Sequence, residues 1–459
     1  MGSTNGRDHN LALRLGKEVE GRVIAPGDPE YDDARSVFYG GLEKRPAAVV
    51  RVASDADVAR VIAEARETGL ELAVRSGGHS VAGHSVTEGG IVLDLSEMRA
   101  LKIDAEHRTA WAGSGVTAGA YSEAASEHGL ATGFGDSPSV GVGGITIGGG
   151  VGFLARKYGL TIDALVAADV VTADGELRRV DGEHEPDLFW AIRGGGGNFG
   201  VVTRLRFRLD EVPEIFGGML ILPATTETVA GWATLSEAAP EELSTIATVM
   251  KAPPMPFLPE AAHGKLVIFG MIVHVGGGET GERAVAPFRE LAEPLADMLK
   301  EMPYTGIYLE EDESFHPIAS DRTMFLDRID DGVAAAILDR IRSSDAMMAA
   351  AQMRVLGGAV ARVPADATAY AHRASKIMVN VAALFERVED RPKYEEWVQA
   401  FADAIRQDDE GAYVNFLEDE GPERVRAAYP GTTWDRLREI KRRYDPTNLF
   451  RLNQNIPPA

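Results

Sequence analysis

Residues 141–152 read GVGGITIGGGVG, and no other part of the chain says more about its architecture. Seven of these twelve residues are glycine, which is more than turns require. A backbone without side chains can approach a flat or anionic ligand closely, so the run predicts a cofactor site. It does not fit the dinucleotide fingerprint Gly-x-Gly-x-x-Gly, because Thr146 occupies the last glycine position of the best register. A Rossmann NAD site is therefore disfavoured.

A second glycine cluster lies upstream, where residues 75–80 read RSGGHS directly after an expected strand. Two consecutive glycines allow backbone N–H groups to turn toward an anion such as a pyrophosphate. Taken alone, the same pair is also consistent with an ordinary turn that binds nothing.

Two further clusters lie downstream. Residues 187–200 read DLFWAIRGGGGNFG, which predicts a short aromatic helix, a glycine turn and a strand; this could be no more than a tight connection. Residues 444–456 read YDPTNLFRLNQNI. Asn453 and Asn455 would face the same side of an extended segment, although alone they could simply be part of a hydrogen-bonded tail.

The rest of the chain divides into two patterns. Strands are expected at 47–52, 70–74, 166–172 and 201–209, and helices after Ser54, which caps a helix with Asp57 as the capping-box acid, and over 117–128. Between 214 and 410, apolar runs predict strands at 218–222, 266–275 and 377–384, and amphipathic stretches predict helices at 282–302, 332–342 and 394–406. This pattern favours an antiparallel sheet covered by helices on one face. The last forty residues have turn and loop character.

Composition excludes several classes of protein. The chain has 459 residues, enough for two or three domains, and a formal net charge of −23, which argues against nucleic acid and anionic membranes as partners. The sequence contains no run of about eighteen apolar residues, so no membrane span is predicted. Cysteine is absent, which excludes disulfides, thiolate catalysis and cysteine-ligated metals. The polar N-terminus lacks a signal-peptide pattern, so we expect a cytoplasmic protein. We also expect no metal site.

The four clusters, in this order, resemble the berberine-bridge-enzyme-like branch of the vanillyl-alcohol oxidase / p-cresol methylhydroxylase superfamily of FAD enzymes. The resemblance extends from about residue 45 to the C-terminus. It implies an α+β fold with a two-part FAD-binding domain of the p-cresol methylhydroxylase type, formed by residues 1–213 and 411–459. Residues 214–410 would form a substrate-binding domain with an antiparallel sheet covered by helices.

The resemblance also implies a set of cofactor contacts. His79 would carry FAD covalently through the 8α-methyl group of the flavin. The remaining FAD-binding residues implied by the family pattern are Arg75, Ser76, Gly77, Gly78, Ser80, Gly83, Ser137, Pro138, Ser139, Val140, Gly143, Gly144, Thr146, Gly149, Gly150, Gly152, Phe153, Val202, Tyr413, Asn415, Asn453 and Asn455.

The chain departs from the family pattern at three positions. Ser137 replaces a cysteine that makes a second flavin bond in many members, so a single linkage is expected. Phe416 replaces a tyrosine that lies near the reacting carbon. Asn380 occupies the place of a catalytic glutamate, and an amide cannot accept a proton as a carboxylate does. Bacterial members with a single linkage resemble the sequence better than plant members do.

The catalytic candidates are accordingly few. Asn380, Arg354 and Tyr304 are the side chains expected near the substrate, although Arg354 would act only by lowering the pKa of a neighbour and Tyr304 could equally be a packing residue. His372 is more consistent with bracing a strand. Val140 stands where the family gates oxygen beside the flavin.

The resemblance implies an FAD-dependent oxidase that transfers a hydride from a small organic alcohol or amine to the flavin, with O2 as the acceptor and hydrogen peroxide as the product. The alternatives are a dehydrogenase with another electron acceptor and a flavin-binding module without turnover. A homodimer is compatible with the sequence. The sequence does not name the substrate, because fold does not determine function.

Overall fold

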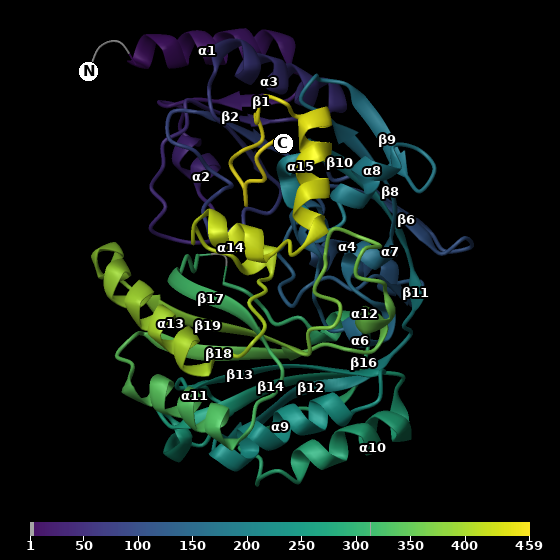
Figure 1. Ribbon diagram of the computed structural model, residues 1–459, viewed down its shortest axis with the longest axis vertical. Helices are drawn as coiled ribbons and strands as arrows, with labels where there is room; N and C mark the ends of the chain where they lie inside the picture. The colour runs from purple at the N-terminus through teal and green to yellow at the C-terminus, as the bar shows by residue number, and fades with distance from the viewer. Residues whose placement is uncertain (1–3, 313) are drawn as a thin grey trace.

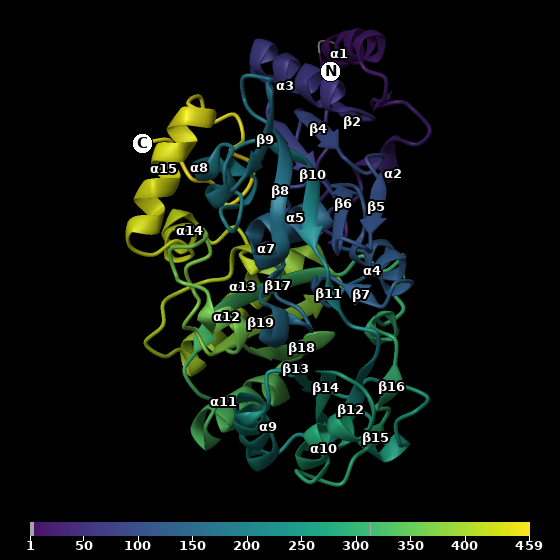
Figure 2. The same ribbon diagram turned by 90° about the vertical axis from the view of Figure 1, so that its right-hand side faces the viewer.

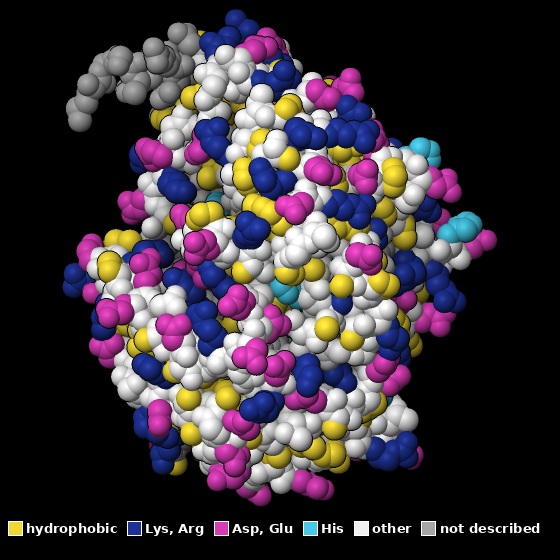
Figure 3. All heavy atoms as spheres, in the orientation of Figure 1, with side chains coloured by type: hydrophobic (Ala, Val, Ile, Leu, Met, Phe, Trp, Pro, Cys, Tyr) yellow, Lys and Arg dark blue, Asp and Glu magenta, His cyan; other side chains and the backbone are white. Residues whose placement is uncertain are grey.

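The computed structural model describes residues 4–312 and 314–459 (Figure 1). The expectation of no leader peptide rests partly on residues 1–3, which lie outside the described residues. No helix in the described ranges is long and apolar enough to cross a membrane. Figure 3 shows acidic and basic side chains interspersed over one face of the molecule.

The first sheet has four strands in the order β1 (Arg22–Ile24), β2 (Ala48–Arg51), β4 (Ile91–Asp94) and β3 (Leu72–Arg75). Helices α1 (Thr4–Glu18) and α3 (Asp55–Thr68) share a hydrophobic core with it, and α2 (Tyr31–Arg35) follows β1. Ser54 caps α3 as predicted, because its side chain accepts a hydrogen bond from the Asp57 backbone N–H. The Asp57 carboxylate instead accepts from backbone N–H groups of Glu20, Gly21 and Ala53, so the expected reciprocal capping box does not form.

The second sheet is antiparallel and has five strands. Their order is β5 (Leu101–Asp104), β6 (Thr109–Gly113), β10 (Val201–Arg208), β8 (Leu165–Val171) and β9 (Leu177–Asp181). The short strands β7 (Leu130–Ala131) and β11 (Asp210–Glu211) pair beside it. The helices of this part are α4 (Ala118–Ser126), α5 (Val142–Gly148), α6 (Ala155–Tyr158), α7 (Thr161–Ala164), α8 (Pro186–Ala191) and the 3₁₀ turn η1 (Gly196–Asn198).

The third sheet is the largest, with eight strands, and all of its pairs are antiparallel. Its order is β15 (Ala296–Asp297), β12 (Ile215–Pro223), β14 (Leu266–Val275), β13 (Leu243–Lys251), β18 (Met348–Val355), β19 (Ile377–Phe385) and β17 (Ile318–Leu326), and β16 (Lys300–Met302) also pairs with β12.

Helices cover one face of this large sheet, and its other face points toward the two smaller sheets (Figures 1 and 2). The covering helices are α9 (Thr226–Ala238), α10 (Gly278–Arg289), α11 (Asp331–Ser343) and α13 (Arg391–Ile405). Alternate strand residues such as Met353 and Val379 pack with Ile337 and Phe401 of these helices in one core. The chain therefore has the predicted α+β architecture. Its shorter elements are α12 (Ala359–Arg362), η2 (Glu260–Ala262), η3 (Tyr304–Ile307), η4 (Val388–Asp390) and η5 (Val414–Phe416).

The helix expected over 282–302 is wrong in its second half. Helix α10 ends at Arg289, and the chain then forms β15 and β16 along the edge of the large sheet. Pro294 cannot continue a helix and disfavours helical backbone in the residue before it. The Arg289 side chain bonds to Asp297 (Nε to Oδ2, 2.6 Å), which fixes the turn back to the sheet.

The loop character expected for the last forty residues is wrong for the two helices that this segment forms, although residues 445–459 contain no helix or strand. This segment contains α14 (Pro422–Ala427) and α15 (Thr432–Tyr444), and α15 lies beside α8 of the N-terminal half (Figure 1). Its few apolar residues, such as Leu437 and Ile440, enter the core of the five-stranded sheet. The chain thus returns to the N-terminal half after completing the large sheet.

Candidate active site

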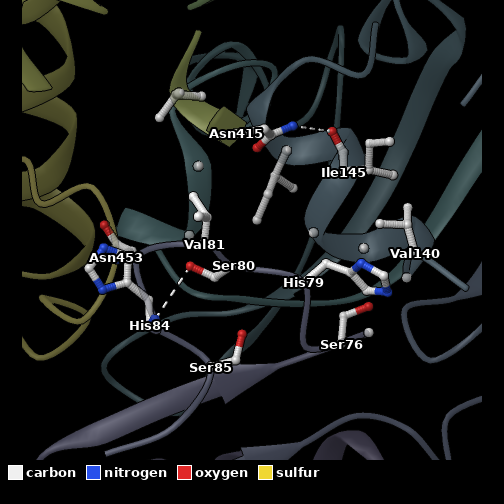
Figure 4. A pocket seen from close by; sticks show the side chains of 18 of the residues that line it. Ser76, His79, Ser80, Val81, His84, Ser85, Val140, Ile145, Asn415 and Asn453 are labelled. Atoms are coloured by element: carbon white, nitrogen blue, oxygen red, sulfur yellow. Dashed lines mark hydrogen bonds between the residues drawn. The ribbon is translucent and has the colours of Figure 1, made fainter. Parts of the chain in front are cut away.

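A cavity of about 460 Å³ lies between the glycine-rich segments of the N-terminal half and the inner face of the large sheet. Figure 4 shows His79, Ser76 and Val140 toward one end, and His84 with Asn453 toward the other. The cavity brings together fifteen predicted residues from seven separate segments: Ser76, Gly77, Gly78, His79, Ser80, Ser137, Val140, Gly143, Gly144, Val202, Arg354, Asn380, Tyr413, Asn415 and Asn453.

The other predicted residues do not border this cavity. They are Arg75, Gly83, Pro138, Ser139, Thr146, Gly149, Gly150, Gly152, Phe153, Tyr304 and Asn455.

Arg75 is the clearest case of a predicted residue whose side chain is held away from the cavity. Its guanidinium is buried and bonds to Asp94 (Nη2 to Oδ2, 2.7 Å) and to the backbone oxygens of Ala34 (2.6 Å) and Ser36 (3.1 Å). These contacts hold the loop that precedes His79 from behind, so Arg75 shapes the cavity wall and does not face a ligand there.

Two glycines of the 141–152 run serve close packing between protein segments. Gly150 has a φ of +79°, and a Cβ at this position would collide with Thr161; a Cβ on Gly152 would collide with the backbone carbonyl of Phe134. Other residues of the run border the cavity from both of its halves, namely Gly141, Gly143, Gly144, Ile145, Ile147 and Val151.

Tyr304 and Phe153 lie together in an apolar core and not at the cavity. Burial raises the pKa of the Tyr304 phenol, so the hydroxyl group stays protonated and cannot act as a base. His372 is buried as well, stacks on Phe325 and bonds through Nε2 to the backbone oxygen of Ala428 at 3.0 Å. These contacts agree with a bracing role for His372.

His79 is held in one orientation by two contacts. Its ring stacks on Phe38 with 4.3 Å between centroids, and its Nε2 lies 3.0 Å from the Ser139 hydroxyl. Ser139 thus acts on the site through His79. Burial lowers the pKa of the imidazole, so at neutral pH the ring is uncharged and one nitrogen has a free lone pair.

The C-terminal segment braces the glycine-rich helix α5. The Asn415 side-chain amide donates to the Ile145 backbone oxygen at 3.0 Å (Figure 4) and to the Tyr413 hydroxyl at 2.9 Å. The same hydroxyl accepts from the Gly150 N–H at 2.9 Å. Tyr413 and Asn415 therefore connect residues far apart in sequence along one wall of the cavity.

Two polar contacts occur near the positions that depart from the family pattern. Ser137 donates to Glu311 across the cavity mouth (Oγ to Oε1, 2.6 Å). Arg354 is buried, bonds to Asp136 (Nη2 to Oδ2, 2.7 Å) and lies 4.8 Å above the Phe416 ring. The arginine charge is thus already compensated by a protein carboxylate.

Several residues at the cavity were not predicted from the sequence, among them His84, Asp321 and Gln352. Burial lowers the pKa of His84 to about 4, so its ring is neutral near pH 7. His84 lies five residues after His79 in the same loop, which was a usable signal. Asp321 and Gln352 lie on β17 and β18, and only strand register brings them to the cavity.

The cavity fits a large polar cofactor. The imidazole Nε2 of His84 and the amide oxygen of Asn453 are buried there without a hydrogen-bond partner in the described part of the chain. Buried polar atoms usually have partners, so both indicate a ligand. A Cβ on Gly144 would meet no atom, which leaves that stretch of backbone open to the cavity. His79, Ser80, His84 and Asn453 would contact the cofactor.

Comparison with known proteins defines this cofactor. Residues 46–181 match the family described as FAD binding domain, and residues 412–457 match the family described as berberine and berberine like. Both matched segments contribute residues to the cavity. The fold and site therefore define an FAD-linked oxidoreductase.

Similarity over the full length narrows the class further. The chain is 32% identical over 461 residues to (R)-6-hydroxynicotine oxidase of Paenarthrobacter nicotinovorans, covering 96% of this chain and 97% of that protein. It is 29% identical to a xylooligosaccharide oxidase of Thermothelomyces thermophilus, covering 96% and 93%. The crystal structure of 6-hydroxy-D-nicotine oxidase from Arthrobacter nicotinovorans superposes with a TM-score of 0.84, at 28% identity, over 96% of this chain and 98% of that one. The chain belongs to the berberine-bridge-enzyme-like family of FAD-linked oxidoreductases.

Proposed function

We propose that the protein is an FAD-dependent oxidase that oxidises a small organic alcohol or amine and returns the electrons to O2, with hydrogen peroxide as the product. The observation that carries this proposal is that His79 and Val140 share one cavity with the polar face of the large sheet. The flavin, when bound, supplies the two-electron acceptor for the substrate and the site of reaction with oxygen. The names of two relatives, a hydroxynicotine oxidase and an oligosaccharide oxidase, support oxidase activity.

The cofactor is proposed to be attached through His79 alone. The Ser139 hydroxyl contacts Nε2, so Nδ1 would carry the bond. The neutral ring has its lone pair on Nδ1 in the tautomer that donates Nε2–H to Ser139. Ser137 stands where a second bond forms in doubly linked relatives, but a serine hydroxyl is a poor nucleophile near neutral pH. Phe38, stacked on His79, fixes the ring plane.

The other residues of the cavity bind and orient. Gly77, Gly78 and Ser80 would hold the pyrophosphate, and Asn453 would close over the cofactor from the C-terminal segment. Val140 borders the cavity with a short side chain that leaves room for O2. Arg354 and Phe416 form part of the wall on the substrate side.

A panel of alcohols and amines, assayed for peroxide, tests the proposal. Peroxide formation with at least one compound is the expected result. Anaerobic bleaching of the flavin without oxygen uptake in air would instead make the protein a dehydrogenase with another acceptor. A flavin that no compound bleaches would favour a binding module without turnover.

A further inference from the structure

The face of the large sheet that borders the cavity carries a row of polar side chains. Gln352 of β18 pairs with Asn380 of β19, and Asn380 pairs with Thr323 of β17. Asp321 and Arg354 each lie two residues from a member of this row, so they belong to the same face. All of these residues except Thr323 line the cavity.

Three carboxylates line the cavity within the described ranges, and they differ in their surroundings. Asp136 is paired with Arg354 at 2.7 Å. Glu311 is exposed and accepts a hydrogen bond from Ser137. Asp321 is only 5% exposed and makes no ion pair with any described residue. Asp321 is therefore the buried carboxyl that is open to a ligand.

One oxygen of Asp321 is oriented by the protein and the other has no partner. The Asn380 amide donates to Asp321 Oδ2 at 3.1 Å. Asp321 Oδ1 and Asn380 Oδ1 are both buried without a hydrogen-bond partner in residues 4–312 and 314–459. Buried acceptor atoms usually have a donor partner, so both atoms indicate a ligand that carries an O–H or N–H group at this wall of the cavity.

The charges around Asp321 come from its own strand and from the C-terminal segment. Arg322 donates to Glu418 (3.1 Å) and to the Asp321 backbone oxygen (2.8 Å) and pairs with Glu420 (3.4 Å). Its charge opposes the rise in the pKa of the Asp321 carboxyl, and the charge of Glu420 adds to that rise. Tyr39 also borders the cavity, and burial raises the pKa of its phenol. Burial and then the charge of Glu418 raise the pKa of the Asp321 carboxyl, and burial raises that of Glu418 to about 7.

We propose that Asp321 is the catalytic residue that accepts the proton of a substrate hydroxyl group, which makes the substrate an alcohol and not an amine. The proposal rests on the proposed oxidase function. A neutral amine needs no dedicated base, whereas oxidation of an alcohol requires a group that takes the hydroxyl proton. Asn380 is a positioning residue that holds the carboxyl through Oδ2.

The O–H bond of the alcohol breaks, and its proton moves to Asp321. The C–H bond on the same carbon breaks, and the flavin, when bound, would accept its hydrogen together with both electrons. The substrate becomes a carbonyl compound, and O2 later removes the two electrons and two protons as hydrogen peroxide.

Anaerobic flavin reduction between pH 5 and pH 9 tests the proposal, with benzyl alcohol and cellobiose as hydroxyl probes and benzylamine as the amine probe. The wild type should be reduced by a hydroxyl probe, and its rate should fall as the pH is lowered and Asp321 is protonated. Asp321→Asn should slow reduction by about 10²–10⁴-fold and remove this pH dependence. Its covalent flavin and its reoxidation in air should remain unchanged.

Glu418→Gln is the matched variant, because Glu418 raises the pKa of Asp321 without lining the cavity. It should move the fall in rate to lower pH and keep the maximal rate within a few fold. Asp321→Asn with the wild-type rate, a fall in rate that persists in Asp321→Asn, or reduction by benzylamine alone would each overturn the proposal.

The pH dependence of Tm, measured without substrate, tests the role of Asp321 independently of the proposed oxidase activity. A buried carboxyl with a raised pKa binds a proton in the folded state that it has lost in the unfolded state, so its contribution to stability is lost as the pH rises through the folded pKa. The Tm of Asp321→Asn relative to wild type should therefore increase from pH 5 to pH 9. The exposed Asp339→Asn control should show no such trend.

If no probe bleaches the flavin, the oxidase proposal fails. A difference between Asp321→Asn and wild type that is independent of pH overturns the role of Asp321.

Discussion

At the scale of single residues, Val140 tests the use of oxygen. Val140→Leu adds one methylene to the cavity wall beside His79, where it would fill space that O2 needs. Reoxidation of the reduced flavin in air should slow by about tenfold, equivalent to ~1.4 kcal/mol in the barrier. Anaerobic reduction by substrate should change little. Stopped-flow absorbance measures both steps, and equal slowing of the two would show that Val140 is a packing residue only.

Ser137 tests the alignment of the same loop. Ser137→Cys introduces a thiol where doubly linked relatives make a second bond, so we expect peptide mapping to find flavin on both the His79 and the residue-137 peptides. Ser85→Cys is the control, because Ser85 borders the cavity near His84, away from His79 (Figure 4). Its thiol should stay free. A free, titratable thiol at position 137 would place this loop out of register and remove the basis for the Val140 assignment.

At the scale of elements, a buried ion pair holds the returning C-terminal segment. Lys441 and Asp445 are both fully buried and bond at 2.6 Å on the last turn of α15. Lys441 also donates to the backbone oxygens of Asn198 and Phe450, and Asp445 accepts from the N–H groups of Leu449 and Phe450. Lys441 and Asp445 therefore fasten the segment at 449–450 to Asn198, which directly follows the glycine turn.

Asp445→Asn should destabilise the protein by about 3–5 kcal/mol, because it leaves the Lys441 ammonium buried without a counter-charge. Denaturant unfolding measures the effect. Asp187→Asn breaks an exposed pair with Arg436 and should cost less than about 1 kcal/mol. A loss of similar size in the two variants would mean that the pair at 441 and 445 does not anchor the segment.

The elements that the sequence predicted well are those with continuous local signals. Strand β14 occupies 266–275 as expected, because ten largely apolar residues end at a glycine-rich turn. Strand β17 was missed because four consecutive polar residues, 320–323, interrupt the apolar run in its sequence, IASDRTMFL. Pro294 should have ended the helix expected at 282–302, and α15 was missed because most of its residues are charged.

The residues of the candidate site also divide into those that a local motif predicts and those that only the fold brings together. The position of His79, Val140 and Asn453 at the cavity could be predicted because each lies in a local motif. Asp321 could not, because only the register between β17 and β19 brings it beside Asn380. The domain boundaries at 213 and 410 remain predictions, although the strands of the large sheet lie between Ile215 and Phe385.

At the scale of the whole molecule, a bidentate ion pair joins the N-terminal half to the segment before β19. Arg373 bonds to both oxygens of Asp163 at 2.8 Å, and both side chains are largely buried. Arg373→Met should lower the free energy of unfolding by about 3–5 kcal/mol, because Asp163 loses its buried partner. Calorimetry measures this loss. Arg387→Met, which removes an exposed pair with Glu389, should leave Tm within about 1 °C. Equal stability of the Arg373 variant and wild type would contradict the joining role.

The covalent attachment of FAD through His79 is the central claim, and the mass of the intact chain under denaturing conditions tests it most directly. The purified wild type should exceed its sequence mass by one FAD, and His79→Ala should have the mass of the bare chain while still folding. A wild-type chain at its bare sequence mass, from a preparation that is yellow before denaturation, would contradict the claim.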